Sequence, residues 1–212
     1  MKKSMIKNGL LLALFALLCT ALVAVVNDLT RDQIKAQEQQ QLLQVLGQII
    51  PASIHDNVLT DNCTLLNDEE ALGTEEDMPA FIATKDGKPV AIAIETIAPD
   101  GYSGAIKLIV GINSKGEVLG VRTLNHQETP GLGDKIELKK SNWVLGFNHK
   151  TIESANDKQW GVKKDGGEFD QFTGATITPR AYVKAVKNTL LYFNANKQQI
   201  FSQPLTCGVS HE

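Results

Sequence analysis

The chain has 212 residues, of which 42% are hydrophobic and 21% are charged, with a net charge of −3 at neutral pH. This composition is ordinary for a globular protein, and the length allows one domain with a sizeable core plus an appendage. The acidic balance argues against nucleic acid as a partner, because nucleic-acid-binding domains carry clustered basic charge.

The first predicted element is an apolar N-terminal segment. Residues 9–26 contain no charged residue, and Lys2, Lys3 and Lys7 precede them. A run of this length is near the lower end of what spans a bilayer, and the positive-inside rule puts its basic start in the cytoplasm. The alternative is a cleaved signal peptide, but the run exceeds the roughly 7–15 apolar residues of such a segment and lacks an Ala-x-Ala site. We therefore predict an uncleaved transmembrane anchor.

The segment after the anchor is polar and Gln-rich over residues 27–50, with apolar residues at its far end. We expect it to be a helix that leaves the membrane and packs on the domain at its end. Residues 68–77 are acidic and contain a glycine, which predicts a surface loop. Cys63 and Cys207 would share an oxidising compartment, where they either form a disulfide or stay unpaired.

Four strand-like segments follow in the middle of the chain. The first two, residues 80–85 and 89–97, flank an Asp-Gly pair, which is a strong hairpin signal. The other two, residues 105–112 and 117–124, flank an Asn-Ser-Lys-Gly turn. Consecutive hairpins predict an antiparallel sheet, and strands followed by helices predict an α+β domain.

The chain after the strands begins with a segment of irregular structure. Residues 128–133 read Glu-Thr-Pro-Gly-Leu-Gly, and the proline and glycines interrupt any regular period. We expect a short helix from Asp134 or Lys135 to Trp143. The four histidines are scattered along the chain and indicate no metal site.

The last predicted element is a helix over residues 179–194, in which apolar residues recur at steps of three and four. Pro179 is favoured at the first helical position, so Thr178 is the expected cap and Thr176 lies two residues outside the helix. Unpaired N–H groups and the positive end of the helix dipole favour a phosphate at this point. Gly174 would let a bulky ligand approach the backbone.

The segment 170–176, Asp-x-x-Thr-Gly-Ala-Thr, resembles the flavinylation motif of the FMN-binding domain found in Rnf and Nqr electron-transport complexes. The likeness extends to residues 100–104, 126–133 and 163–167 and is closest to the G subunits of the Rnf (also called Rsx) complexes. In that family FMN is joined by its phosphate, as a phosphoester, to the last threonine of the motif, which is Thr176 here. A flavin transferase attaches it, with FAD as the donor.

The resemblance implies a set of residues that bind FMN. Thr176 would carry the covalent FMN phosphoryl group. The other expected cofactor-binding residues are Thr173, Gly174, Ala175, Asp170, Glu128, Thr129, Gly131 and Leu132. No catalytic residue and no metal ligand is expected, because electron-transfer chemistry belongs to the cofactor.

The roles of several residues stay open at this point. Asp170 would serve the flavin transferase or act as a turn residue. Tyr102 either stacks on a ring system or packs at the core or its edge. Lys163 and Lys164 either offset phosphate charge or form a solvated basic pair. His126 is expected to be a structural side chain.

The predicted organisation is one N-terminal transmembrane helix followed by one α+β FMN-binding domain with an antiparallel sheet and flanking helices. The expected ranges are 1–8 for a cytoplasmic N-terminus, 9–27 for the anchor, 28–78 for a helical and loop connection, 79–200 for the FMN-binding domain and 201–212 for a C-terminal tail. The domain would lie in the periplasm of a bacterium, anchored in the inner membrane.

The resemblance implies an electron carrier that works only with the other, integral-membrane subunits of an Rnf/Rsx-type complex. Such complexes couple ion movement to electron transfer between ferredoxin and NAD. No independent catalytic turnover is expected of this subunit. The alternative is a flavin-free structural or sensory domain, and a third possibility is a free-standing flavin reductase, for which the sequence has no nicotinamide or substrate motif.

Overall fold

The computed structural model describes residues 2–207, and the chain divides into two compact units after Leu43. The first unit is most of helix α1 (Lys2–Ile49), whose apolar residues from Leu10 to Val26 are exposed. Within the described residues, α1 is the one helix long and apolar enough to cross a membrane. The helix predicted over residues 27–50 is confirmed as the second half of α1.

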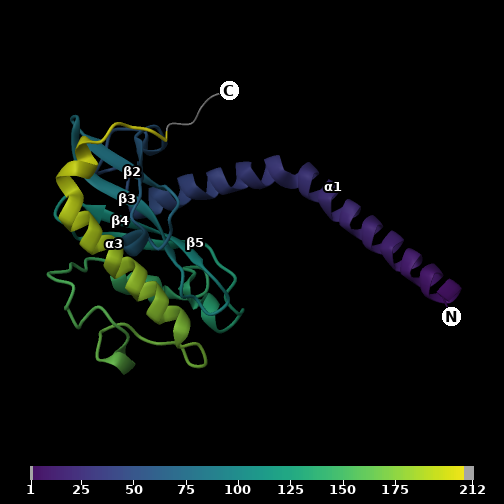
Figure 1. The fold of residues 1–212 in the computed structure, drawn as a ribbon. Helices are drawn as coiled ribbons and strands as arrows, with labels where there is room; N and C mark the ends of the chain where they lie inside the picture. Colours follow the sequence, from purple (N-terminus) through teal and green to yellow (C-terminus); the bar gives the residue numbers. More distant parts are fainter. Residues whose placement is uncertain (1, 208–212) are drawn as a thin grey trace. The chain divides into compact units, whose positions relative to one another are not determined.

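The second unit is built on a five-stranded antiparallel sheet whose strands lie in chain order (Figure 1). The strands are β1 (Cys63–Leu66), β2 (Met78–Lys85), β3 (Lys88–Ala98), β4 (Ile106–Asn113) and β5 (Val118–Asn125). The four predicted strands are confirmed as β2 to β5. Strand β1, which pairs with β2, is an additional strand that the sequence pattern did not indicate.

The Asp-Gly hairpin between β2 and β3 shows why these residues turn the chain. Asp86 has φ of +51° and Gly87 has φ of +70°, and the flanking Lys85 and Lys88 are paired across the strands. Two consecutive residues with positive φ make the two-residue turn whose twist matches that of antiparallel strands. The hairpin signal in the sequence is therefore confirmed.

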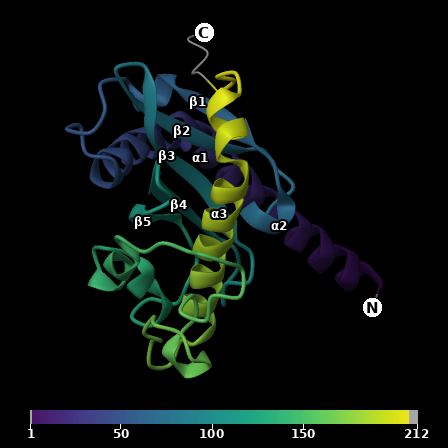
Figure 2. The same ribbon diagram turned by 90° about the vertical axis from the view of Figure 1, so that its left-hand side faces the viewer.

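Helix α3 (Ile177–Ser202) crosses one face of the sheet (Figure 2). Its buried side chains, among them Tyr182, Val186 and Phe193, join the main hydrophobic core. A short helix, α2 (Glu69–Leu72), packs against α3. The prediction of a loop throughout residues 68–77 is therefore wrong, because Asp68 accepts the Ala71 N–H at 2.9 Å and caps this helical turn.

The opposite face of the sheet is covered by the end of α1. Side chains alternate along a strand, so Val110 and Ile112 join the core under α3 while Gly111 faces the other way. Gly111 pairs with Gly120 on β5, and Ile49 lies over the two glycines. A Cβ on Gly111 would overlap the Ile49 Cγ2. The paired glycines thus form the notch that receives Ile49.

The remaining helical turns are of the 3₁₀ type. They are η1 (Leu59–Asp61), η2 (Gly133–Ile136), η3 (Asn142–Phe147) and η4 (Lys163–Asp165). The single helix predicted from Asp134 or Lys135 to Trp143 is wrong, because η2 and η3 are separate turns. Ser141 begins η3 by accepting the Trp143 N–H at 3.2 Å, which starts a new turn after a break.

The predicted start and end of the last helix are also wrong. The helix begins at Ile177, two residues before Pro179, and it ends at Ser202 rather than at residue 194. Pro179 lies in the first turn, where N–H groups have no partner within the helix, so its missing N–H costs no hydrogen bond. Proline therefore marks the first turn of this helix but not its first residue.

A disulfide joins Cys63 on β1 to Cys207, with the two Cα atoms 5.1 Å apart. The Thr206 N–H also donates to the Cys63 carbonyl at 2.9 Å, so the chain after α3 runs along β1. Of the two alternatives left open by the sequence, the structure has the disulfide. It closes a loop across a sequence separation of 144 residues.

Reduction of this disulfide is expected to lower the free energy of unfolding by about 2–5 kcal/mol, because a long cross-link restricts the unfolded chain. Unfolding of the full chain in detergent can be followed by tryptophan fluorescence, with and without reductant. The control is the double variant Cys63→Ala/Cys207→Ala, whose unfolding midpoint should be the same with and without reductant. Equal unfolding midpoints for oxidised and reduced wild type would contradict the expectation.

Gly111→Ala is expected to destabilise the domain by about 1–3 kcal/mol, because the new methyl group overlaps Ile49 and forces the end of α1 to shift. Gly47→Ala is the matched control, since its Cβ meets nothing within 4 Å. The control should be neutral or slightly stabilising, as alanine favours helix over glycine. The measurement is the denaturant midpoint of each variant. A Gly111→Ala midpoint equal to that of wild type would contradict the claim that Ile49 needs the space left by Gly111.

Candidate functional site

A cleft of about 310 Å³ opens where three segments meet: the β3–β4 loop, the loop after β5, and the turn that leads into α3. Six of the residues predicted to bind a cofactor line it, namely Glu128, Thr129, Leu132, Gly174, Ala175 and Thr176. The further lining residues are Tyr102, Gly133, Ile177 and Thr178. The fold therefore brings together two motifs that are more than forty residues apart in the sequence.

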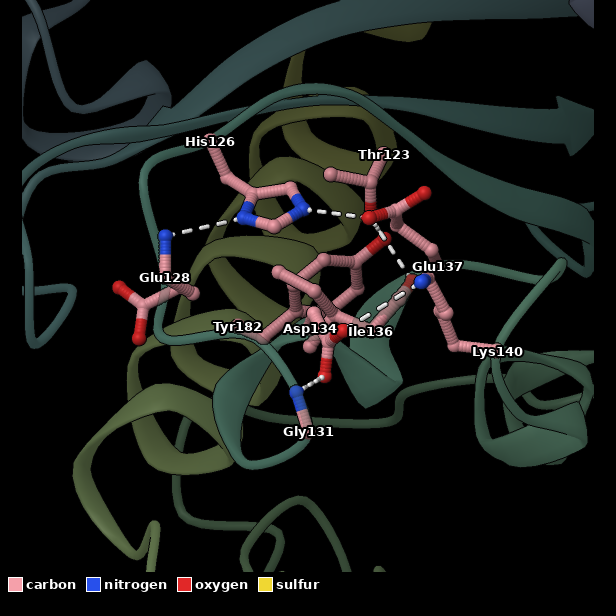
Figure 3. Close-up of polar contacts among 9 residues, drawn as sticks. All are labelled: Thr123, His126, Glu128, Gly131, Asp134, Ile136, Glu137, Lys140 and Tyr182. Atoms are coloured by element: carbon pink, nitrogen blue, oxygen red, sulfur yellow. Dashed lines mark hydrogen bonds and ion pairs between the residues drawn. The ribbon is translucent and has the colours of Figure 1, made fainter.

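One wall of the cleft is the loop after β5, which is folded on itself by backbone hydrogen bonds. The N–H groups of Leu132 and Gly133 donate to the Thr129 carbonyl at 3.1 and 3.0 Å. Gly131 has φ of +79°, and its N–H donates to the Asp134 carboxylate at 2.8 Å (Figure 3). These bonds fix Leu132 at the mouth of the cleft.

His126 holds the start of this loop. Its Nδ1 accepts the Glu128 N–H at 3.0 Å, and its Nε2 lies 3.0 Å from the Glu137 carboxylate (Figure 3). Because a backbone N–H can only donate, Nδ1 is the acceptor, and the proton on Nε2 donates to Glu137. His126 thus has the structural role that the sequence analysis expects.

A second set of hydrogen bonds ties the strand, the loop and the helix together beneath the cleft. The Thr123 hydroxyl donates to the Ile136 carbonyl at 2.8 Å, so it accepts from the Tyr182 hydroxyl, 3.1 Å away (Figure 3). Tyr182 is fully buried on α3, and this burial raises the pKa of its hydroxyl. The tyrosine therefore stays a donor over the physiological pH range.

The other wall is the turn that precedes α3. The Ala175 N–H donates to the Phe172 carbonyl at 3.1 Å, and Gly174 between them has φ of +82°. A Cβ on Gly174 would lie 3.2 Å from a methyl carbon of Leu132. A glycine is therefore needed here for two reasons: the backbone has a positive φ, and the two walls of the cleft approach each other closely.

The expected cap of α3 is wrong. Thr176 stands at the cap position, and its side chain makes no capping hydrogen bond. The Thr178 side chain is fully buried instead, and its hydroxyl donates to Glu128 Oε2 at 2.5 Å. The Thr178 hydroxyl is thus directed to a partner fifty residues away in the sequence rather than to the start of its own helix.

Among the described residues, Glu128 is the one charged side chain that lines the cleft, and only 4% of it is exposed. Its other oxygen, Oε1, accepts the Ser103 N–H at 3.1 Å. Three basic side chains of the neighbouring segments are engaged elsewhere, in the ion pairs Lys163–Asp170, Arg180–Asp165 and Lys184–Asp100. Within residues 2–207, no lysine, arginine or histidine lines this cleft.

Comparisons with known proteins agree with this geometry. Residues 1–49 match the family described as the RnfG N-terminal region, and residues 101–191 match the FMN-binding domain. The G subunit of the ion-translocating oxidoreductase complex of Shewanella baltica is 71% identical over 212 residues, which is the full length of both chains. The corresponding G subunits of Shewanella oneidensis and Vibrio parahaemolyticus are 69% and 60% identical, over 100% and 95% of both chains.

The chain belongs to the RnfG family. It combines one apolar N-terminal helix with a region that matches the FMN-binding domain. All of the residues that line the cleft fall inside the region matched by the FMN-binding domain. The sequence resemblance to the G subunits of Rnf complexes is therefore confirmed.

Exposed apolar side chains gather around the cleft, and sequence reasoning missed part of this set. Tyr102 is 66% exposed, Ile177 45% and Leu132 40%. Such exposure excludes the core role considered for Tyr102, so its position at the cleft agrees with the alternative considered from the sequence, in which it stacks on a ring system. Ile177 had no signal, because an isoleucine beside a helix usually packs inward. Apolar walls of this kind fit the planar ring of a flavin.

Three of the predicted cofactor-binding residues do not line the cleft. Thr173 is exposed at the tip of the turn, and Gly131 serves the fold of its loop. Asp170 is exposed, its carboxylate accepts from Lys163 at 2.6 Å and its carbonyl accepts from Trp143 Nε1 at 2.7 Å. Among residues 2–207, no group of three or more His, Cys, Asp or Glu side chains could hold a metal ion.

His126→Ala is expected to lower the free energy of unfolding by about 1–3 kcal/mol, because it leaves the part-buried Glu128 N–H without an acceptor. His126→Asn is the matched control, since an amide oxygen can accept the same N–H. Denaturant unfolding compares the two variants with wild type. If alanine and asparagine destabilise the protein equally, the hydrogen bond to Glu128 does not account for the role of His126.

Proposed function

We propose that the chain is the membrane-anchored flavoprotein subunit of an Rnf/Rsx-type electron transport complex, with FMN joined by a phosphoester to Thr176. In this role it relays electrons as part of ion-coupled electron transfer between ferredoxin and NAD. The observation that carries the proposal is the position of Thr176, which lines the cleft at the N-terminal end of α3.

The surroundings of the three threonines in this segment favour Thr176 as the attachment point. The Thr178 hydroxyl is buried and bonded to Glu128, so it is not accessible to a transferase. Thr173 is exposed and does not line the cleft. Thr176 is half-buried, lines the cleft, and keeps its hydroxyl out of the helix cap. It alone among the three combines access with a position at the cleft.

The start of α3 suits the phosphate of an attached FMN. The N–H groups of its first turn have no acceptor inside the helix, and the helix dipole adds positive potential there. Tyr102, Leu132 and Ile177 offer apolar surface that would hold the ring and keep water from it. When bound, FMN supplies the ability to take up and release single electrons.

The charges around the cleft favour a covalent bond over a dissociable one. In the described part of the chain, no basic side chain lines the cleft, and Lys163, Arg180 and Lys184 nearby form ion pairs with acidic residues. Arg180, for example, makes two hydrogen bonds to Asp165 and lowers the pKa of that carboxyl group. Without a basic clamp on its phosphate, and without an FMN pool outside the cytoplasm, a free cofactor would be lost by mass action.

Two features support an orientation with the domain in the periplasm and the anchor, residues 9–27, in the inner membrane. Lys2, Lys3 and Lys7 precede the apolar run, and basic residues stay on the cytoplasmic side. The disulfide between Cys63 and Cys207 belongs to an oxidising compartment. The two observations come from different parts of the chain and agree.

The proposal includes partners that act at different times. During maturation, a flavin transferase would recognise the motif, and Asp170 suits that role because it is exposed beside the cleft rather than inside it. In the finished complex, the integral-membrane subunits would supply and remove electrons. The domain ranges for this assembly are those expected from the sequence: 28–78 as the connection and 79–200 as the FMN-binding domain.

Thr176→Ala is expected to abolish covalent flavin, because no other hydroxyl in the segment is both accessible and inside the cleft. Each variant is co-expressed with a flavin transferase, run on a denaturing gel and viewed under ultraviolet light, and its intact mass is measured. Thr176→Ser and Thr173→Ala are the controls, and both should keep the FMN adduct. A fluorescent Thr176→Ala band would overturn the assignment, and a dark wild-type band would favour a flavin-free structural or sensory subunit.

A further inference from the structure

Among the described residues, the charge inside the cleft is carried by one buried carboxylate, that of Glu128. Glu128 lines the cleft with 4% of its surface exposed, and both of its oxygens act as acceptors. Oε2 accepts from the Thr178 hydroxyl and Oε1 from the Ser103 N–H. Two donors, one to each oxygen, are the arrangement that suits an ionised carboxylate.

The backbone around Glu128 leaves its carboxylate no room to turn away from this position. A Cβ on Gly101 would lie 2.9 Å from Oε1, and a Cβ on Gly133 would lie 2.7 Å from Oε2. The two glycines therefore let the chain close on the carboxylate from both sides. Only 4% of Glu128 is exposed, and the direction of its side chain is fixed by packing as well as by hydrogen bonds.

Other buried acids of this domain have a basic partner, and within the described residues Glu128 has none. Glu95 is 3% exposed and pairs with Lys107 at 2.7 Å, and Asp134 is 6% exposed and lies 3.8 Å from Lys140. No ion pair of Glu128 is found among residues 2–207. A buried charge without a counter-ion is costly for folding, so its retention at the cleft indicates an effect on what the cleft holds.

We propose that Glu128 acts on the flavin through its charge: it keeps a fixed negative charge beside the flavin ring and lowers the reduction potential of the flavin. The inference rests on the proposed function. Each electron that arrives from a reduced one-electron carrier adds negative charge to the ring, and no bond is broken. Repulsion by the carboxylate disfavours the reduced form, and the low dielectric of a water-excluded site strengthens this repulsion.

The direct test is the midpoint potential of Glu128→Gln in the full-length, FMN-loaded protein in detergent. Glutamine keeps the shape and removes the charge. The potential, followed by the visible spectrum during a reductive titration at neutral pH, is expected to lie above that of wild type. Glu117→Gln removes the same charge from a residue that pairs with His149 and does not line the cleft, and it should match wild type.

An unchanged or lower potential in Glu128→Gln would overturn the proposal. If that variant does not fold, Thr129→Asp and Thr129→Asn form a second pair that differs by one charge in the cleft. The aspartate member should then have the lower potential, and equal potentials would also overturn the proposal. Intact mass is measured first. A wild-type protein without an FMN adduct would contradict the proposed function itself, whereas in an FMN-loaded protein the potentials test only the role of Glu128.

Discussion

The hydrogen bond from Thr178 to Glu128 is the contact on which the site depends. It joins the first turn of α3 to the loop after β5, and these two segments form the walls of the cleft. Gly133 makes the bond possible, since a Cβ there would lie 2.9 Å from the Glu128 Cβ and 3.0 Å from the Thr178 hydroxyl. The same contact keeps Thr178 inside the protein and leaves Thr176 at the cleft.

This contact also explains the division of roles among neighbouring residues. His126 holds the backbone of Glu128, while Thr178 and a loop N–H hold its carboxylate. The glycine-rich motifs are needed because the chain passes very close to these groups, and not only because a ligand approaches. The cleft is thus built by long-range polar contacts and walled by a few exposed apolar side chains, a combination suited to a planar and charged cofactor.

The sequence predicts the parts of the fold that local chemistry determines. The Asp86-Gly87 turn and the strand-like pattern of β2 to β5 indicated the antiparallel sheet, and the uncharged run indicated the apolar helix. The sequence pattern did not indicate strand β1, because this strand has only four residues and is held in place by its pairing with β2 and by the disulfide. The prediction that Thr178 caps the helix was wrong because the helix already begins at Ile177. The Thr178 hydroxyl bonds instead to Glu128, a partner that no local pattern contains. The local pattern pointed to Gly174 and to a phosphate beside Thr176, the resemblance supplied Glu128, Thr129, Leu132 and Ala175, and neither source indicated Ile177.

The proposed role of the cleft depends on a single bond between the Thr176 oxygen and the FMN phosphate. The most direct measurement is fragmentation mass spectrometry of the tryptic peptide between Lys164 and Arg180, taken from the protein isolated from its own membrane. We expect this peptide to carry FMN less one water, with the fragments placing the addition on Thr176. An unmodified peptide, or an addition on Thr173 or Thr178, would contradict it.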